Sequence, residues 1–395
     1  MAQSFYSRNN FFETRKQPMQ FMNTLLKHAT QIVVSLALLG CAAGSAPPKP
    51  AALQSFTPLV NVSQVWRTQL SGPVSRTLRM HGSATSVAVV TDDGSVQIIA
   101  AANGTMLSQS TVQDEVVAGA GFDGTVVAIV TASNQLVAVS GKKLLWRAQL
   151  PARSYTQPLV AGGRVFVLLA DQRVSAFDAS NGAELWTQRY SGEPLVLAHP
   201  GLLTAVGNAL VVGVGERLVA MNPDNGQTAW DVSLAQPRGV DEIERLVDLV
   251  AEPAVIGSVV CARAFQASVS CVDINSRTRL WSVTSYGANG MSGDAQAVYS
   301  TDSVGRVTAW ATATGVELWT HALLLHRGLT TPLALGKTLV VGDSLGYMHW
   351  LSRDNGSVMA RLPTDGSAIV GAPLLVDGTL IAITAKGGVF AWRPE

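Results

Sequence analysis

A short phrase that usually ends in tryptophan recurs about every forty residues from residue 60 onwards. Its clearest copies read NGAELW, NGQTAW and TGVELW, and weaker copies keep the turn residues but lose the tryptophan. The copies end at Trp66, Ser108, Trp146, Trp186, Trp230, Trp281, Trp319 and Ala360. A period near forty residues is that of a four-stranded propeller blade, so this spacing predicts a repeat architecture closed into a ring.

One repeat, residues 158–190, shows how each unit is built. Val165–Ala170 is a continuous apolar run, Arg173–Phe177 alternates, and Glu184–Arg189 carries the tryptophan, with turn residues between them. A continuous apolar run is typical of strands buried on both faces, as when blades stack on their neighbours. The tryptophan supplies a large side chain to fill that interface.

The two ends of the repeat series predict how the ring closes. Trp66 precedes the first complete unit, whereas the C-terminal unit has no tryptophan strand of its own. We therefore expect an all-β fold, an eight-bladed propeller of four-stranded blades, in which the N-terminal strand closes the last blade and removes the free edges. Seven blades is the alternative, if the copy at Ser108 or at Ala360 is not a blade.

Composition sets bounds on the class of protein. Of the 395 residues 47% are hydrophobic and 14% are charged, which predicts a large buried core. The formal net charge is +1 and the chain has no basic run, which argues against nucleic acid as a partner.

The N-terminal residues have the layout of an export signal. Lys27 precedes the apolar run Ile32–Leu39, which is too short to span a bilayer and ends at Gly40-Cys41. The ending LLGC resembles the bacterial lipobox, in which the cysteine is acylated and becomes the mature N-terminus. That resemblance implies a lipoprotein signal peptide over residues 1–40, with translation starting at Met1 or at Met22. Ala42 stands where inner-membrane lipoproteins carry aspartate, which implies the outer membrane, with the body facing the periplasm.

Residues 41–60 read as a tether. They are rich in proline and show neither helical nor strand periodicity. We expect an extended, lipidated segment that holds the propeller, residues 61–395, up to about 60 Å from its anchor.

Two cysteines remain besides Cys41. Cys261 and Cys271 are placed symmetrically about Gln266, so they would oppose each other in a hairpin. An oxidising periplasm would permit a disulfide between them. Two free buried thiols are the alternative.

Catalytic signals are few. The histidines show no HxH or HExxH spacing and there is no CxxC, so no metal site is predicted, and Gly213–Leu218 lacks the helix that a phosphate loop requires. The tryptophan repeat also resembles the blades of quinoprotein dehydrogenases, but those enzymes carry a vicinal cysteine pair, and here the two cysteines are ten residues apart. We predict no catalytic residue and no cofactor. A glycan-binding propeller is a further alternative, although no exposed aromatic cluster recurs in each blade.

One repeat carries an insertion. Trp230 and Trp281 are 51 residues apart, and the extra length includes the acidic stretch GVDEIERLVDLV, residues 239–250. Insertions in repeat proteins map to exposed loops, which often bind partners. Apolar residues flanked by acids predict a contact patch with an apolar centre and a polar rim, rather than a merely solvated loop.

Two stretches carry a family resemblance beyond the repeat itself. They are LLLHRGLTTP, residues 323–332, and VVGDSLGYMHW, residues 340–350. Together with the lipobox, the tether and the propeller repeat, they resemble the BamB family of outer-membrane β-barrel assembly. The resemblance implies a non-enzymatic scaffold lipoprotein of the BAM complex, which binds the POTRA domains of BamA and other BAM subunits and takes no small-molecule substrate.

The resemblance also implies a partner surface made of two neighbouring inter-blade loops. The first loop of the family has the pattern L-x-L-R, which Leu195 and Leu197 match while Ala198 replaces the arginine. The second has the pattern E-I-x-R-L-x-D-x-D, in which Val250 replaces the last acid. The matching positions in the second loop are Glu242, Ile243, Arg245, Leu246 and Asp248.

Overall fold

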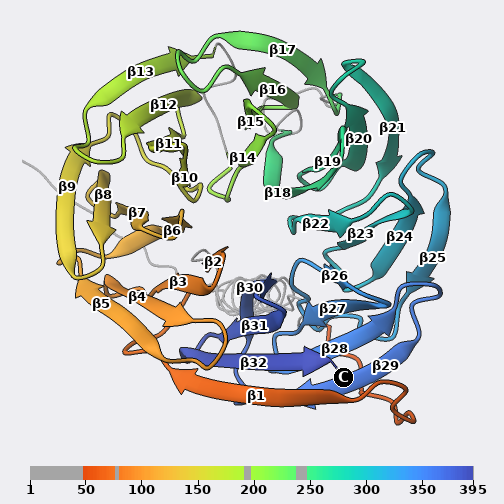
Figure 1. The fold of residues 1–395 in the computed structure, drawn as a ribbon. Helices are drawn as coiled ribbons and strands as arrows, with labels where there is room; N and C mark the ends of the chain where they lie inside the picture. The colour runs from red at the N-terminus through yellow and green to blue at the C-terminus, as the bar shows by residue number, and fades with distance from the viewer. Residues whose placement is uncertain (1–47, 76–79, 191–196, 237–246, 395) are drawn as a thin grey trace, which may run out of the picture. The chain divides into compact units, whose positions relative to one another are not determined.

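The computed structural model describes residues 48–75, 80–190, 197–236 and 247–394. By its contacts the chain divides into two compact units, residues 1–49 and 50–395. The second unit holds the strands of eight four-stranded sheets, which follow one another around a ring (Figure 1). The described part of the chain contains no helix long and apolar enough to cross a membrane.

Each sheet is one blade, numbered here from 1 to 8 in chain order. Blade 1 contains β2 (His81–Ser83), β3 (Ser86–Val90), β4 (Ser95–Ala100) and β5 (Met106–Thr111); blade 2 contains β6 (Val116–Phe122), β7 (Val126–Thr131), β8 (Gln135–Ser140) and β9 (Lys143–Gln149). Blade 3 contains β10 (Leu159–Ala161), β11 (Arg164–Leu168), β12 (Arg173–Asp178) and β13 (Glu184–Arg189); blade 4 contains β14 (Leu203–Val206), β15 (Ala209–Val214), β16 (Arg217–Met221) and β17 (Thr228–Ser233).

The second half of the ring repeats this order. Blade 5 contains β18 (Leu249–Ile256), β19 (Val259–Ala264), β20 (Ser268–Asp273) and β21 (Thr278–Thr284); blade 6 contains β22 (Met291–Gly293), β23 (Ala297–Thr301), β24 (Val307–Ala311) and β25 (Glu317–His321). Blade 7 contains β26 (Leu333–Leu335), β27 (Thr338–Gly342), β28 (Tyr347–Ser352) and β29 (Val358–Pro363); blade 8 contains β30 (Ile369–Val376), β31 (Thr379–Thr384), β32 (Gly388–Pro394) and β1 (Val62–Gln69).

Blade 8 closes the ring with strands from both ends of the chain. Its order is β1-β32-β31-β30, and β1 pairs antiparallel with β32 from Val62↔Pro394 to Gln69↔Gly388. The predicted eight blades and the closing N-terminal strand are both confirmed. The weak copies at Ser108 and Ala360 lie in the complete blades 1 and 7, which rules out the seven-bladed alternative.

The recurring tryptophan joins each blade to the next at five of the junctions. Its indole N–H donates to a backbone carbonyl of the following blade, and its ring covers a glycine in the turn before that blade's outer strand. The tryptophan, glycine and carbonyl are Trp66, Gly104 and Ala101; Trp146, Gly182 and Ala179; Trp186, Gly226 and Pro223; Trp281, Gly315 and Thr312; Trp319, Gly356 and Arg353, with N···O distances of 2.7–2.9 Å. A Cβ on any of these glycines would come within 2.7 Å of the ring. The recurring sequence phrase therefore needs both its tryptophan and its glycine.

The junction after blade 1 shows what happens without the indole. Ser108 stands in the tryptophan's position, and Lys142 of blade 2 stands where the five blades above have the glycine. Packing there depends on the apolar second and third strands. All six residues of β7 are buried, as expected for strands covered on both faces.

The propeller unit begins earlier than the predicted boundary at residue 61. Residues 51–60, which we call the strap, lie against blades 6 and 7 and continue into β1. The Ala51 N–H donates to the Leu325 carbonyl and the Leu59 N–H donates to the Met359 carbonyl, both at 2.9 Å. The second half of the expected tether is therefore packed chain, because its apolar side chains meet blade surfaces that the sequence pattern does not reveal.

We predict that Gly226→Ala destabilises the propeller more than Gly207→Ala does. Both glycines have positive φ, +72° and +57°, so both substitutions carry backbone strain. Only the Gly226 Cβ would meet a ring, at 2.6 Å from Trp186, whereas nothing lies within 4 Å of the Gly207 position. The extra cost should be about 1–3 kcal/mol, measured by denaturant unfolding. Equal losses in the two variants would contradict the role of the indole contact.

Candidate functional site

Two neighbouring inter-blade connections form the candidate site. One runs from β13 to β14 and the other from β17 to β18. Strands alternate in direction along each blade, so every connection between blades emerges on the same face as the turns between second and third strands. This face is called the connection face below. Among the predicted partner residues, Leu197 and Asp248 are described, whereas Leu195, Glu242, Ile243, Arg245 and Leu246 lie outside the described residues.

A hydrogen bond between Leu197 and Asp248 joins the two connections. The Leu197 N–H donates to Asp248 Oδ2 at 2.9 Å. These residues are 51 positions apart in the chain, and the predicted site assigns them to different loops. The contact brings together the described ends of the connections that precede and follow blade 4.

Backbone bonds below this contact fix both connections to the blades. The Ala251 N–H donates to the Pro200 carbonyl, and the Leu249 N–H donates to the Gly215 carbonyl, each at 2.9 Å. Gly201 and Val250 form an isolated antiparallel bridge. The ends of the two connections are thus held by the ring.

The two departures from the family pattern have different surroundings. Val250 is 2% exposed and lies inside β18, so an acid at this position would be buried. Ala198 is exposed, so the arginine expected there would reach solvent or a partner. The absence of arginine at residue 198 therefore removes a surface charge, whereas the absence of an acid at residue 250 does not.

Burial raises the pKa of the Asp248 carboxyl above its usual value. Repulsion from Glu216 acts in the same direction, and the hydrogen bond from the Leu197 N–H opposes both. A half-buried carboxylate with a raised pKa is costly to keep ionised, so its backbone partner offsets part of that cost. Asp248 can position the loops as well as contact a partner.

A shallow pocket lies under the Leu197–Asp248 contact. Its lining includes Leu168, Leu197 and Leu249, with the polar residues Tyr155 and His199. Tyr155 belongs to the connection between β9 and β10, and the sequence reasoning missed it. Its position in the preceding inter-blade connection was the available signal, because equivalent connections meet on one face. Such an apolar hollow with polar edges suits a protein contact.

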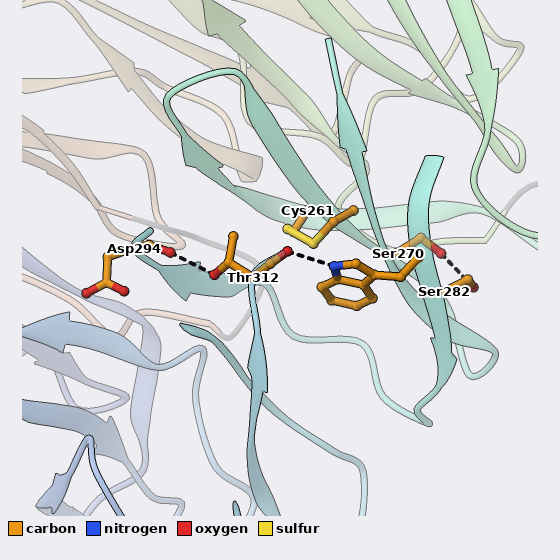
Figure 2. Close-up of a disulfide and its surroundings, with 7 residues drawn as sticks. Cys261, Ser270, Ser282, Asp294 and Thr312 are labelled. Atoms are coloured by element: carbon orange, nitrogen blue, oxygen red, sulfur yellow. Dashed lines mark hydrogen bonds between the residues drawn. A yellow bond between two sulfur atoms is a disulfide. The ribbon is translucent and has the colours of Figure 1, made fainter. Parts of the chain in front are cut away.

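Cys261 and Cys271 form a disulfide inside blade 5, away from this surface. They are directly opposed in the antiparallel strands β19 and β20, and both are fully buried. Figure 2 shows the bridge beside the indole that donates to the Thr312 carbonyl. The bridge is thus part of the packing between blades 5 and 6.

Metal-ligating residues do not gather in the part of the chain that the structure describes. No group of three or more histidine, cysteine, aspartate or glutamate side chains there could hold a metal ion.

Known proteins are similar to this chain in sequence and in fold. The family model described as outer membrane protein assembly factor BamB matches residues 92–321. The outer membrane protein assembly factor BamB of Burkholderia pseudomallei is 34% identical over 95% of this chain and 100% of its own length. The chain belongs to the BamB family.

Solved structures share the propeller fold. The crystal structure of BamB from Moraxella catarrhalis matches with a TM-score of 0.76 at 23% identity, covering 84% of this chain and all of that one. Quinohemoprotein alcohol dehydrogenase from Comamonas testosteroni matches with a TM-score of 0.63 at 14% identity, covering 84% of this chain and 76% of that one. At these identities both likenesses show the fold alone. The relatives in the BamB family are named as assembly factors, not as enzymes.

We predict that Asp248→Asn and Asp248→Ala behave differently. Asparagine keeps an oxygen acceptor for the Leu197 N–H, whereas alanine leaves that donor without it. Folding raises the pKa of Asp248, so the folded state favours the protonated carboxyl. The contribution of this group to the free energy of unfolding is therefore fully present below the unfolded pKa and is lost as pH rises through the folded pKa. Asp248→Asn should therefore gain stability relative to the parent protein as pH rises from about 3 to 7, measured by thermal unfolding.

Asp365→Asn is the control, because its stability relative to the parent protein should change with pH in the opposite direction. Burial alone would raise the pKa of Asp365, but hydrogen bonds from Ser367 and Thr384 outweigh it and lower the pKa. Its carboxylate stabilises the fold above the unfolded pKa, and that contribution is lost in acid. Asp365→Asn should therefore lose stability relative to the parent protein as pH rises. The same trend in both asparagine variants would contradict the assignment.

The disulfide is tested by counting thiols. Denatured, unreduced protein should show no reactive thiol from Cys261 or Cys271, and reduction should release two. Breaking the bridge should lower the free energy of unfolding by about 2–3 kcal/mol because it closes a short loop. Two reactive thiols before reduction would contradict the pairing.

Proposed function

We propose that the protein is a scaffold of the outer-membrane β-barrel assembly machinery that binds the POTRA domains of BamA. The hydrogen bond between Leu197 and Asp248 is the observation that carries the proposal, because it joins two separate sequence patterns into one surface. Leu195, Leu197, Glu242, Ile243, Arg245, Leu246 and Asp248 are the proposed contact residues. The relatives' name, outer membrane protein assembly factor, supports the same role and contact with other BAM subunits.

The surface matches the chemistry of a protein contact. Leu197 is joined to Asp248 near the ends of two connections that backbone hydrogen bonds hold to the ring, which favours an apolar centre with a polar rim. Ala198 removes one cation from the pattern, so the apolar centre should carry more of the binding free energy than in relatives with arginine there.

We further propose that residues 1–40 are a lipoprotein signal peptide and that Cys41 is acylated. The lipid would hold the chain on the outer membrane, with the propeller in the periplasm. The lipobox ending LLGC supports this arrangement, and the relatives' name is consistent with it. The scaffold role needs no cofactor, metal or catalytic residue.

Site-directed photocrosslinking from full-length protein in its own outer membrane tests the partner contact. Probes at Leu197 and Leu246 should capture a POTRA-bearing protein. A probe at Leu185 is the matched control, because this exposed leucine is the second residue of the outer strand of blade 3 and so lies near the opposite face. Capture from Leu185 alone, or from neither surface, would overturn the proposal.

A charge at the apolar centre should weaken the complex. We expect Leu197→Glu to reduce copurification of the POTRA-bearing partner at least about tenfold, as for a central contact residue, while Leu185→Glu has no effect. Quantitative immunoblotting after mild detergent extraction measures both. Unchanged copurification with Leu197→Glu would place the contact elsewhere.

A further inference from the structure

The strap, residues 51–60, is fastened to the ring near both of its ends. Near its start the Ala51 N–H donates to the Leu325 carbonyl, and Arg327 Nη1 donates to the Ala51 carbonyl, both at 2.9 Å. Ala51 is thus held through both of its backbone polar groups. Its partners belong to the connection between β25 and β26.

A buried ion pair makes this fastening rigid. Arg327 is 3% exposed and Asp343 is fully buried, and Arg327 Nε donates to Asp343 Oδ2 at 2.7 Å. The same Oδ2 lies 2.9 Å from His349 Nε2. Burial alone would raise the pKa of Asp343, but its hydrogen bonds from His349, the Tyr347 N–H and Arg327 outweigh burial and lower the pKa. Asp343 therefore stays ionised and keeps the guanidinium aimed at the strap.

A second cation holds the middle of the strap. Arg361 Nη1 donates to the Gln54 carbonyl at 3.1 Å, and its guanidinium lies 5.0 Å from the centre of the Phe56 ring. Leu53 packs against the apolar cluster between blades 6 and 7. These contacts give roles to both sequence stretches that the candidate site leaves unused, residues 323–332 and 340–350.

The strap reverses the direction in which the chain leaves the propeller. Ala51 lies at the connection face, and Leu59 bonds to Met359, at the start of β29 and so near the opposite face. Strand β1 then runs back, because Val62 pairs with the end of β32 and Gln69 with its start. Without the strap, the chain would leave from the opposite face at Val62. With it, the chain leaves from the connection face.

The exit and the candidate site therefore share a face but lie across the ring. The strap starts at the connection between blades 6 and 7, whereas Leu197 and Asp248 belong to the connections on either side of blade 4. These blades are well separated around the ring (Figure 1). Among the described residues, the exit at Ala51 is therefore separate from the Leu197–Asp248 contact.

We propose that the strap is a latch that sets the length of the leash, the chain between Cys41 and the propeller, and the face of the propeller from which the leash leaves. This inference rests on the proposed acylation of Cys41. With the latch closed, the leash spans residues 41–50 and reaches roughly 30 Å, against roughly 60 Å with it open. A short leash from the connection face keeps the candidate surface on the membrane side of the propeller. That placement raises the effective concentration of the surface at membrane-anchored partner domains.

Hydrogen–deuterium exchange of full-length lipidated protein tests the latch itself. In the parent protein, the Ala51 and Leu59 amides should exchange at least about tenfold more slowly than in unstructured chain. Leu53→Asp with Phe56→Ala alters only the strap and should abolish this protection, while β27 and β28 stay protected. Arg361→Gln should weaken it from the ring side. Arg306→Gln, at an exposed arginine that pairs with Asp302 and not with the strap, should leave it unchanged. Free exchange across residues 51–60 in the parent protein would overturn the latch.

Nanodiscs with quencher-labelled lipid headgroups test the orientation. A fluorophore at Ala198, on the connection face, should be quenched more strongly than one at Leu185, on the opposite face. Opening the latch through the strap variants should reduce or reverse that difference. An unchanged difference after loss of strap protection would refute the effect on orientation. Failure to bind nanodiscs at all would instead count against acylation of Cys41, and loss of partner capture with normal exchange would count against the partner surface.

Discussion

The contact between an indole ring and a glycine of the next blade is the interaction on which the ring depends. At Trp186, for example, the ring lies where a Cβ of Gly226 would be, and its N–H bonds to the Pro223 carbonyl. One side chain thus satisfies a buried donor, fills the wedge between two sheets and sets their spacing. Because the contact is made in the same place at several junctions, one geometry is repeated around the circle, and repetition of one geometry is what allows the circle to close.

Because the strands hold the blades together, the connections between blades are free to vary in length and sequence. The second and third strands carry the buried packing, whereas the chain between blades needs only to bridge a fixed gap. The connection from β17 to β18 could therefore lengthen without disturbing the ring. The Leu197–Asp248 hydrogen bond uses that freedom, and the bonds at Ala251 and Leu249 limit it.

The fold follows from local patterns, and the contacts that complete it do not. The blades were predictable because period, turns and tryptophan recur in phase, and the opposition of Cys261 and Cys271 because a hairpin is symmetric about its turn. The burial of Val250 needed the register of β18, which the irregular pairing between Val250 and Ala254 obscures. The strap was missed for a different reason. Its principal partner, Arg327, is 276 residues away in the chain, and no pattern within residues 51–60 indicates it.

Pairing of β1 with β32 makes the first strand to be synthesised the last to find its partner. Val62 pairs with Pro394, so until β1 and β32 come together the propeller is an open arc with one three-stranded blade and one solitary strand. Contacts of such sequence separation form slowly. During that interval, the β1 strand of a second copy fits the gap equally well, and strand exchange between copies competes with closure. Closure within one chain is favoured when the local concentration of its own β1 strand exceeds the concentration of neighbouring chains, so dilution during folding favours closure over strand exchange.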